Sequence, residues 1–558
     1  MRDYYQVDGQ PLGERNPKWL QDDYVKFIRF GQWRIQQSGA GVLAFITNHG
    51  YLDNPTFRGM RQQLMQTFTD IYVLDLHGNT KKKERCPDGS PDENVFDIQQ
   101  GVAIGVFVKE PGKEGPAGLH HADLWGLRQS KYNTLFDTDL ACTEWRELTP
   151  EPPFHLFVPQ RAELRPEYER GWKVTEAMPV NSVGIVTSRD GFVFDLDEAN
   201  LQARIAAFLN PAHSDETVGR RYLSDRDKLD VGQARKQIRG ERDLSTSFAR
   251  CLYRPFDMRH LLYHDAVIER PRREVMRHMR WGNLALCVGR AGQVVGTDLW
   301  DIVFCSSAVE DFNLFYRGGN VNFPLYIYSQ EGLQGTLVTQ QGHSVNLNPS
   351  FLAEIEKPLG LAFLSDGTGD LVTTFGPEDV FHYVYAILHS PTYRTRYADF
   401  LKIDFPRVPL TTDVSLFRTL CALGAELVAL HLMESPLLDK LITSYPLPGD
   451  DIVEKVAYRA PGEPEPGSGK PLEKGRVYIS EGKPKEGKAG QYFDGIPPEV
   501  WHFHVGGYQV CEKWLKDRKG RVLSYDDRVH YQKIVVALQE TIRLMAAIDQ
   551  AIPSWPLP

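Results

Sequence analysis

Arginine is concentrated in one segment of the sequence, residues 250–290. It contains nine Arg, no Lys and four acidic residues, so its local charge is +5 in a chain whose net charge is −9. The guanidinium group presents a rigid fork of donors that matches phosphate oxygens and the acceptor edge of guanine. Tyr253, Tyr263 and Trp281 lie among these arginines and could stack on bases. The segment therefore predicts a local nucleic-acid-binding surface.

The same segment also has a structural interpretation. Arg254 could pair with Asp257, and Arg270 with Glu274, in a salt-bridged region that never meets a ligand. For any single arginine, a structural salt bridge is more common than a contact with nucleic acid. The nucleic-acid interpretation thus rests on the segment as a whole.

Two other segments combine cations with aromatic residues. Residues 502–524 contain a Gly-Gly pair that would let the backbone approach a partner closely, followed by five Lys and Arg around Trp514. Residues 388–409 place Arg394 and Arg396 beside tyrosines. For residues 502–524 the alternative is ordinary charge on a helix surface. For residues 388–409 the alternative is a packed turn. The residues that we predict to contact nucleic acid are Arg254, Arg259, Arg270, Arg272, Arg273, Tyr393, Arg394, Lys513 and Arg518.

Other motifs give no site. Residues 462–471 resemble a phosphate loop, but Pro stands at the first glycine position and Pro471 follows the lysine. The histidine pairs at 120–121 and 502–504 lack a carboxylate-rich partner motif, so no metal site is predicted. The seven cysteines are far apart and form no CxxC pair, which excludes a zinc ribbon and suits a reducing cytosol.

The pattern of the first part of the chain predicts alternating helices and strands. Continuous apolar runs such as VLAFIT are typical of strands buried on both faces of a parallel sheet. A long polar loop, residues 77–94, follows the second of these runs and is either a solvated connection or a functional excursion. The predicted helices span 22–37 and 57–69, and the predicted strands span 42–47, 71–76 and 101–108.

From residue 248 onward short β-type runs replace this alternation, and long amphipathic helices follow. Residues 460–490 are rich in Gly, Pro, Lys and Glu around one strand candidate, RVYIS, and predict a mobile insertion. The final helix begins after Ser524, which is expected to be its N-cap. The predicted helices are 377–390, 414–433 and 524–552.

Composition places the chain among folded globular proteins. It has 558 residues, of which 42% are hydrophobic and 25% charged. The longest apolar stretches are far shorter than a bilayer span, and the N-terminus has no apolar signal core. We therefore expect a cytoplasmic protein with no membrane partner.

Several spaced motifs resemble the C-terminal part of Type ISP restriction-modification enzymes, which join nuclease, translocase, adenine-N6 methyltransferase and target-recognition domains in one chain. The resemblance extends from about residue 22 to residue 552. The motifs are NVFDIQQGVAIGVFVK (94–109), ADLWGLRQSKYNTL (122–135), LYRPFDMRHLLYH (252–264), ERPRREVMRHM (269–279) and VGGYQVCEKWLKDR (505–518).

The resemblance implies an α/β fold class. Residues 1–245 would be the back half of a Rossmann-like methyltransferase sheet, and residues 246–558 an α+β target-recognition domain that binds double-stranded DNA. The family's Gly-rich S-adenosylmethionine loop and Asn-Pro-Pro-aromatic tetrapeptide have no counterpart here: residues 16–19 and 151–154 do not match the tetrapeptide. We therefore expect no cofactor in this chain and no methyl transfer by it alone. The missing methyltransferase, helicase and nuclease parts would belong either to a separate polypeptide or to a longer gene product that was truncated or split.

Two other interpretations stay open. The chain could be a complete small-molecule transferase with an unusual α/β core, in which loop 77–94 acts as a substrate lid. It could also be a gene remnant without a present function. DNA binding that weakens steeply with salt would favour DNA recognition over the transferase.

Overall fold

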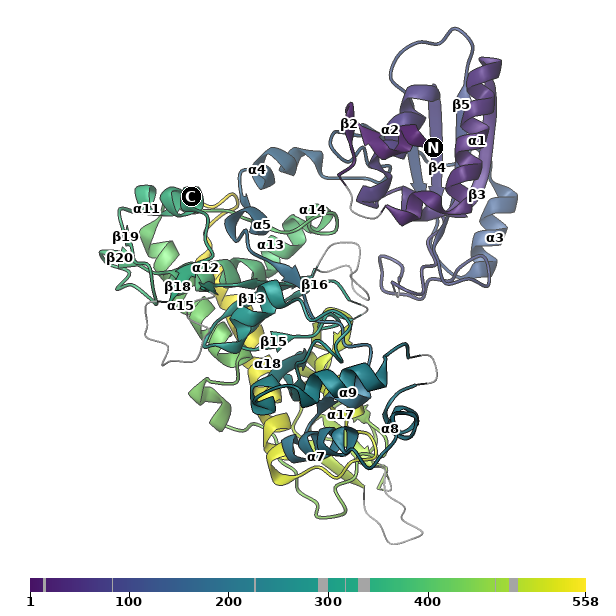
Figure 1. Cartoon of the computed structure of the whole chain (residues 1–558). Helices are drawn as coiled ribbons and strands as arrows, with labels where there is room; N and C mark the ends of the chain where they lie inside the picture. The colour runs from purple at the N-terminus through teal and green to yellow at the C-terminus, as the bar shows by residue number, and fades with distance from the viewer. Residues whose placement is uncertain are drawn as a thin grey trace. The chain divides into compact units, whose positions relative to one another are not determined.

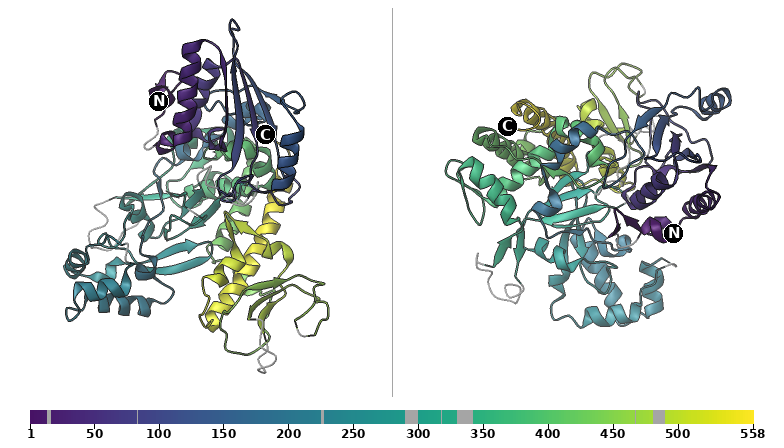
Figure 2. Two further views of the ribbon diagram at one scale, coloured as in Figure 1. Left: turned by 90° about the vertical axis from the view of Figure 1, so that its right-hand side faces the viewer. Right: turned by 90° about the horizontal axis from the view of Figure 1, so that it is seen from above.

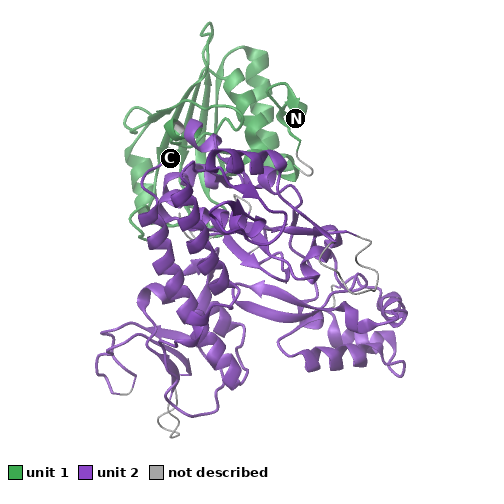
Figure 3. Cartoon of the chain, turned by 90° about the vertical axis from the view of Figure 1, so that its left-hand side faces the viewer, with its two compact units in different colours: residues 1–165, 295–298 green, residues 166–294, 299–558 purple. Residues whose placement is uncertain are grey.

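The described residues form two compact units (Figure 3). The first is Met1–Arg165, and the second comprises Pro166–Val294 and Leu299–Pro558. The division lies 80 residues before the boundary predicted at 245/246. The computed structural model describes residues 1–13, 17–82, 84–224, 227–289, 300–316, 318–329, 342–466, 468–480 and 490–558.

The helices and strands predicted for the first 110 residues are present in unit 1 (Figure 1). Helix α1 ends at Gly39, whose φ of +79° lies in the left-handed region that glycine adopts at low cost. The predicted bounds agree with the structure to within two residues. These elements are α1 (Asp23–Ser38), β3 (Gly41–Asn48), α2 (Arg58–Thr67), β4 (Asp70–Asp75) and β5 (Val102–Lys109).

The sheet of unit 1 has five strands in the order β3-β5-β4-β6-β7, with β6 at Gly118–Asp123 and β7 at Arg146–Leu148. Strand β5 runs antiparallel to both β3 and β4, whereas β4 and β6 are parallel. The sheet is therefore mixed, and the parallel sheet that the apolar runs indicated is present only in part. The prediction that β3 is buried on both faces is wrong, because β3 is an edge strand with alternating exposed and buried residues.

Unit 2 contains two four-stranded sheets, ordered β10-β12-β11-β15 and β14-β13-β16-β9. Two short strands from residues before 245 complete them, since β10 pairs with β12 and β9 pairs with β16. This pairing is why residues 166–245 belong to the second unit. The strands are β9 (Ser182–Val183), β10 (Phe194–Asp195), β11 (Phe248–Arg254), β12 (Asp257–Leu262), β13 (Ala285–Gly289), β14 (Val303–Ser306), β15 (Val309–Glu310) and β16 (Asn320–Pro324).

Three long helices pack together in unit 2: α12 (Pro377–His389), α15 (Val414–His431) and α18 (Tyr525–Ala551). Helix α18 runs beside the two others (Figure 2). Helix α15 is long and apolar enough to cross a membrane by composition, but half of its apolar stretch is buried inside the protein. Its composition is therefore explained by its place in the core.

The segment predicted as a mobile insertion is partly described. RVYIS forms β23 (Arg476–Ser480) between β22 (Ala457–Arg459) and β24 (Gln491–Asp494), so the strand prediction is confirmed. Residues 467 and 481–489 lie outside the described residues, and the mobility of this segment stays a prediction.

Candidate functional site

The loop after β12 carries several of the predicted arginines on a well-fixed backbone. Backbone hydrogen bonds in both directions join Arg270 to Val186, and the Tyr263 hydroxyl donates to the Pro271 carbonyl at 2.6 Å. Arg272 has a φ of +53°, an uncommon value for a non-glycine residue. It occupies the N-cap position of the short helix α10 (Arg273–Met276), without a capping hydrogen bond from its side chain. The hydrogen bonds of Arg270 and Tyr263 fix the backbone of the loop, and its side chains extend from that fixed backbone.

Four residues of this loop form the exposed arginine surface: Arg270, Arg273, Arg280 and Trp281. The side chains of Arg270 and Arg273 are 59% and 54% exposed, and Trp281 is 41% exposed. The Tyr263 ring lies 5.9 Å from the Arg273 guanidinium and 5.7 Å from that of Arg280. Three cations and an indole at the surface are suited to phosphate contact and base stacking.

The ion pairs on this surface are weak ones. Arg270 lies 3.7 Å from Glu269, and Arg273 lies 2.5 Å from Asp265, whose side chain is itself 53% exposed. Exposed pairs of this kind contribute about 0 to 1 kcal/mol. A phosphate could therefore replace either carboxylate at little cost. Arg270 pairs with Glu269, and not with Glu274 as the structural interpretation suggested.

Arg254 and Arg259 are held by ion pairs within unit 2 instead. Arg254 is 8% exposed and donates to Asp311 at 2.8 Å, not to Asp257. Arg259 donates twice to Asp257, at 2.7 and 3.0 Å, and both guanidinium groups lie within 4 Å of the Tyr253 ring centre. Both arginines are thus held by carboxylates and an aromatic ring, Arg254 in the interior and Arg259 with a side chain that is 15% exposed.

Arg518 and Lys513 belong to the same buried network. Arg518 is 4% exposed, donates to Asp257 at 3.0 Å and lies 3.4 Å from the Trp514 ring centre. Lys513 forms an ion pair with Asp517 and is partly exposed. Although burial opposes it, Arg518 and Arg259 hold the pKa of Asp257 below its usual range. The network joins α17 (Val510–Lys516) to β12 and stabilises unit 2.

Tyr393 and Arg394 are also internal. Tyr393 is fully buried, with its hydroxyl donating to the Arg407 carbonyl at 2.6 Å. Arg394 is 7% exposed and donates to the Leu388 carbonyl at 2.7 Å. Burial lowers the pKa of Arg394 to about 10. Both residues support the turn between helices, which agrees with the packed-turn alternative.

Of the nine predicted contact residues, only three lie in the surface loop. Arg270 and Arg273 are exposed, and Arg272 is half-buried beside them. The side chains that the sequence prediction underweighted are Arg280 and Trp281, although both stand in the arginine-dense segment. The density of arginines in a segment does not tell which of them face water, and nucleic-acid contact by this segment stays a prediction.

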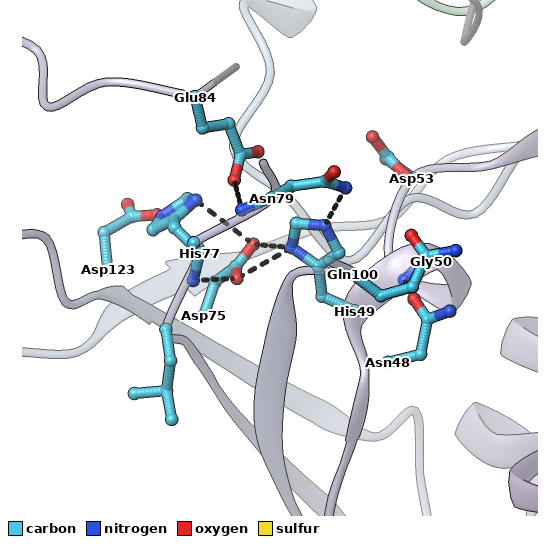
Figure 4. Close-up of polar contacts among 12 residues, drawn as sticks. Asn48, His49, Gly50, Asp53, Asp75, His77, Asn79, Glu84, Gln100 and Asp123 are labelled. Carbon is cyan, nitrogen blue, oxygen red and sulfur yellow. Dashed lines mark hydrogen bonds and ion pairs between the residues drawn. The ribbon is translucent and has the colours of Figure 1, made fainter. Parts of the chain in front are cut away.

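Unit 1 contains a second polar site, at the carboxyl ends of β3, β4 and β6 (Figure 4). His49 directly follows β3, Asp75 ends β4 and Asp123 ends β6. His49 Nδ1 lies 3.0 Å from Asp75 Oδ1, and His77 Nε2 lies 2.8 Å from Asp123 Oδ1. The His77 ring also stacks on Trp125, with ring centres 3.3 Å apart. Ligands of open α/β sheets bind at this end of the strands.

The charges of this polar centre are mutually compensated. Burial would disfavour charge on both partners, but Asp75 raises the pKa of His49, and His49 holds the pKa of Asp75 well below its usual range. His49, His77 and Glu84 could each bring one ligand atom within 4.8 Å of the others, a donor set that suits zinc. Both nitrogens of His77 already lie near carboxylates, at 2.8 and 3.7 Å. We assign no metal to this centre.

Loop 77–94, which the sequence left as a solvated connection or a functional excursion, is firmly anchored. Lys131 and Asp92 form a fully buried ion pair at 2.7 Å, and Lys131 also donates to the Leu76 and Glu93 carbonyls. Asn94 donates to the Gly78 carbonyl at 3.1 Å. A substrate lid would have to break these buried contacts, so this arrangement does not favour the lid interpretation.

The comparisons with known proteins agree with this architecture. Three solved structures match the chain at TM-scores of 0.68, 0.71 and 0.67: a DrdV–DNA complex, the ATP-dependent Type ISP restriction-modification enzyme LlaBIII bound to DNA, and a nuclease-deletion mutant of the Type ISP enzyme LlaGI with a DNA substrate mimic. Sequence identities are 20%, 19% and 19%, so the likeness concerns the fold.

The matched region is nearly all of this chain but only part of each relative. It covers 98%, 100% and 98% of this chain but only 53%, 35% and 42% of the three relatives. No curated protein matches the sequence. The family model of the Type ISP C-terminal specificity domain matches residues 176–547, two thirds of the chain and nearly all of unit 2. This chain therefore belongs to the Type ISP C-terminal specificity domain family.

Proposed function

We propose that this chain recognises a specific sequence in double-stranded DNA as the C-terminal part of a Type ISP-like restriction-modification adenine-N6 methyltransferase. The observation that carries the proposal is the exposed arginine surface, which lies inside the region matched by the specificity-domain family. The three similar structures are complexes with DNA or with a DNA mimic, which supports the same partner here.

Within unit 2 we propose distinct roles for the surface residues. Arg270 and Arg273 contact phosphates, because their exposed guanidinium groups need only exchange a surface carboxylate for a phosphate. Trp281 stacks on a base or a sugar. Arg272, at the start of α10, is the candidate for a base edge in the major groove. The loop's backbone hydrogen bonds keep these groups in register.

We propose further that methyl transfer requires the missing half of the methyltransferase, supplied either by a separate polypeptide or within a longer product of the same gene. That half would contain the S-adenosylmethionine and adenine sites, and the residues present here bind no cofactor by themselves. The sheet of unit 1 supports this division, because its polar centre lies at the end of the strands where such folds bind ligands, without a glycine-rich turn among the described residues beside it. Seven free cysteines, six of them buried, support a cytoplasmic location.

Duplex binding by paired variants tests the DNA proposal. Duplexes bound by the wild-type chain are first selected from a random pool, and one of them is then titrated at several salt concentrations. We expect Arg270→Ala with Arg273→Ala to weaken binding and to reduce the slope of log affinity against log salt by about 1 for each phosphate that the variant no longer neutralises. The control is Arg459→Ala with Arg543→Ala, two arginines that are 42% and 52% exposed on other elements.

Each outcome of this titration is informative. A wild-type chain that binds no selected duplex would overturn DNA recognition. Equal affinities for the two double variants would remove the exposed arginine surface from the interface. Circular dichroism spectra should be the same for all three proteins, because none of the four side chains is buried.

A further inference from the structure

One face of the sheet β14-β13-β16-β9 is polar although it lies inside unit 2. The side chains of a strand alternate between the two faces of its sheet, so Asn320 and Asn322 of β16 lie on the same face. Asn322 pairs with Cys287 of β13, which places that thiol beside it. All three side chains are fully buried. Buried asparagines are uncommon, because each amide loses its hydration and needs polar partners inside the protein.

The other face of this sheet has the apolar residues that a sheet normally buries. Leu286 and Phe323 are paired across β13 and β16, and both are buried. Leu286 lines a small apolar cavity together with Val384 of α12. Packing of the sheet against this helix therefore accounts for the apolar face, but it does not account for the polar one.

Glu310 of β15 brings a carboxyl group to the polar face. Its side chain is fully buried, and among the described residues no Lys, Arg or His forms an ion pair with it. The neighbouring Asp311 is bound by Arg254 at 2.8 Å, so that cation is already neutralised. Asn320 reaches the same segment, because its amide nitrogen donates to the Asp311 carbonyl at 3.4 Å. We call Glu310, Asn320 and Asn322 the internal oxygen cluster.

The surroundings of Glu310 are polar but provide it with no firm partner. Burial raises the pKa of Glu310 to about 8, while Ser306, Asn322 and the Cys287 thiol lie near enough to oppose that rise. None of the three makes a hydrogen bond of ordinary length and angle to the carboxyl group. The Ser306 hydroxyl instead donates to the Ala308 carbonyl at 2.9 Å. These groups therefore surround a common point without contacting one another.

Five atoms of the internal oxygen cluster have no hydrogen-bond partner among the described residues. They are both carboxyl oxygens of Glu310, Oδ1 and Nδ2 of Asn322, and Oδ1 of Asn320. Polar groups at such depth are nearly always satisfied, by the protein, by ordered water or by an ion. Four of the five atoms are oxygens, and two of these share a negative charge when the carboxyl group is ionised. The group that complements them is electropositive.

The chemistry and the charge of the cluster select the class of ion. Carboxylate and amide oxygens are ligands of hard cations, whereas imidazole and thiolate ligands suit zinc and copper. Glu310 contributes one negative charge and the two asparagines contribute none. A monovalent cation therefore leaves the interior neutral, but a divalent cation leaves a positive charge there without compensation. An uncompensated charge inside a protein is strongly unfavourable.

We propose that the internal oxygen cluster binds a monovalent alkali cation, sodium or potassium. The ligands are the Glu310 carboxylate and the Oδ1 atoms of Asn320 and Asn322. Because β15 pairs with β11 whereas the asparagines belong to β16, the ion joins the two four-stranded sheets of unit 2. The cation and a proton compete for the same carboxylate, so Glu310 is protonated only when no cation is bound. The site is separate from the exposed arginine surface and does not depend on DNA recognition.

Thermal denaturation of the full chain in different salts tests the site. Sodium, potassium, calcium and tetramethylammonium chlorides are compared at pH 8 and at one ionic strength, so that charge screening is the same. A ligand that binds only the folded state raises the melting temperature, and we expect sodium or potassium to raise it by roughly 3 °C or more over tetramethylammonium. Glu310→Gln should melt at one temperature in all the salts. The control Glu216→Gln, at a side chain that is 72% exposed, should keep the rise.

Crystals of the wild-type chain soaked in rubidium chloride give a direct measurement, because rubidium is a monovalent cation that scatters X-rays anomalously. We expect an anomalous peak between Glu310, Asn320 and Asn322. The larger rise in melting temperature, with sodium or with potassium, identifies the preferred ion. Equal melting temperatures in all the salts, a rise that persists in Glu310→Gln, or no rubidium peak at this place would overturn the proposal and leave water as the occupant. A rise with calcium alone would overturn the monovalent assignment.

Discussion

At the residue scale, the role of each arginine in segment 250–290 depends on which carboxylate it can reach. Arg254 pairs with buried Asp311, and Arg259 shares buried Asp257 with Arg518. Arg270 and Arg273 meet only exposed carboxylates. Charge that neutralises a buried acid stabilises the fold, and charge left at the surface is available for a ligand.

Asp257 is the residue on which this internal network depends most. Asp257→Asn removes the buried carboxylate that Arg259 and Arg518 share, and leaves them only Asp517 at 3.2 Å and Asp527 at 3.8 Å. We expect the free energy of unfolding to fall by about 3 to 5 kcal/mol, measured by urea denaturation at pH 7. Because the pKa of Asp257 is lowered by folding, this difference should shrink as pH falls through the range in which the carboxyl becomes protonated.

Asp265→Asn is the matched control for that measurement. Asp265 also pairs with an arginine, Arg273, but both side chains are more than half exposed. Its removal should change the free energy of unfolding by less than about 1 kcal/mol. Equal losses for the two variants would contradict the distinction between internal and surface arginines.

Glu310 gives unit 2 a pH dependence of the opposite sign. Its side chain is fully buried, and burial raises its pKa from 4.5 to about 8. Between these pH values the cation-free folded state holds a proton that the unfolded state lacks, so stability falls as pH rises. In a buffer without alkali cations, we expect Glu310→Gln to gain stability relative to the wild type from pH 5 to pH 8, by up to roughly 5 kcal/mol.

Thermal denaturation at a series of pH values checks this expectation. Glu216→Gln, a change at a side chain that is 72% exposed, should keep the same difference from the wild type at every pH. A parallel pH profile for Glu310→Gln and the wild type would show that Glu310 ionises normally in the folded protein.

At the element scale, helix ends can be predicted from neighbouring residues, whereas sheet edges cannot. Helix ends are local: α18 begins where predicted, because Ser524 and Asp527 form a capping box with hydrogen bonds of 3.0 Å in each direction. Sheet edges are not local, since the exposure of β3 depends on which strands lie beside it. The apolar run at residues 42–47 therefore predicts strand β3 correctly, but it predicts the burial of that strand incorrectly.

The cap of α18 can be tested with neighbouring residues. Ser524→Ala removes the acceptor for the Asp527 amide, so we expect a loss of about 1 kcal/mol in the free energy of unfolding. Tyr525→Ala, at a side chain that is 72% exposed, is the control and should cost less. Urea denaturation measures both, and a larger loss for Tyr525→Ala would contradict the role of the cap.

At the scale of the whole molecule, the two units divide the proposed work. Unit 2 carries the family match and the exposed arginine surface, and unit 1 carries the polar centre. The net charge of −9 does not oppose DNA binding, because a short-range phosphate contact responds to the local field within about 10 Å at ordinary salt.

This division predicts how methylation depends on the partner. The chain alone, given S-adenosylmethionine and a selected duplex, should transfer no methyl group to adenine, since neither the cofactor site nor the adenine site is proposed to lie in it. Addition of the missing methyltransferase half should restore transfer from tritiated cofactor. Methylation by the highly purified chain alone would refute the need for a second polypeptide.

The sequence by itself determined the family resemblance, the helices and strands of unit 1, the N-cap of α18 and the arginine-dense segment. These features depend on residue type and on periodicity over a few turns, which the linear chain records directly. The structure alone decided which arginines face water, that β5 runs antiparallel, and that residues 166–245 join the second unit. Each of these depends on partners distant in sequence, as Asp311 is for Arg254 and β16 is for β9. Local patterns cannot specify such pairings, because many alternative partners satisfy the same local chemistry.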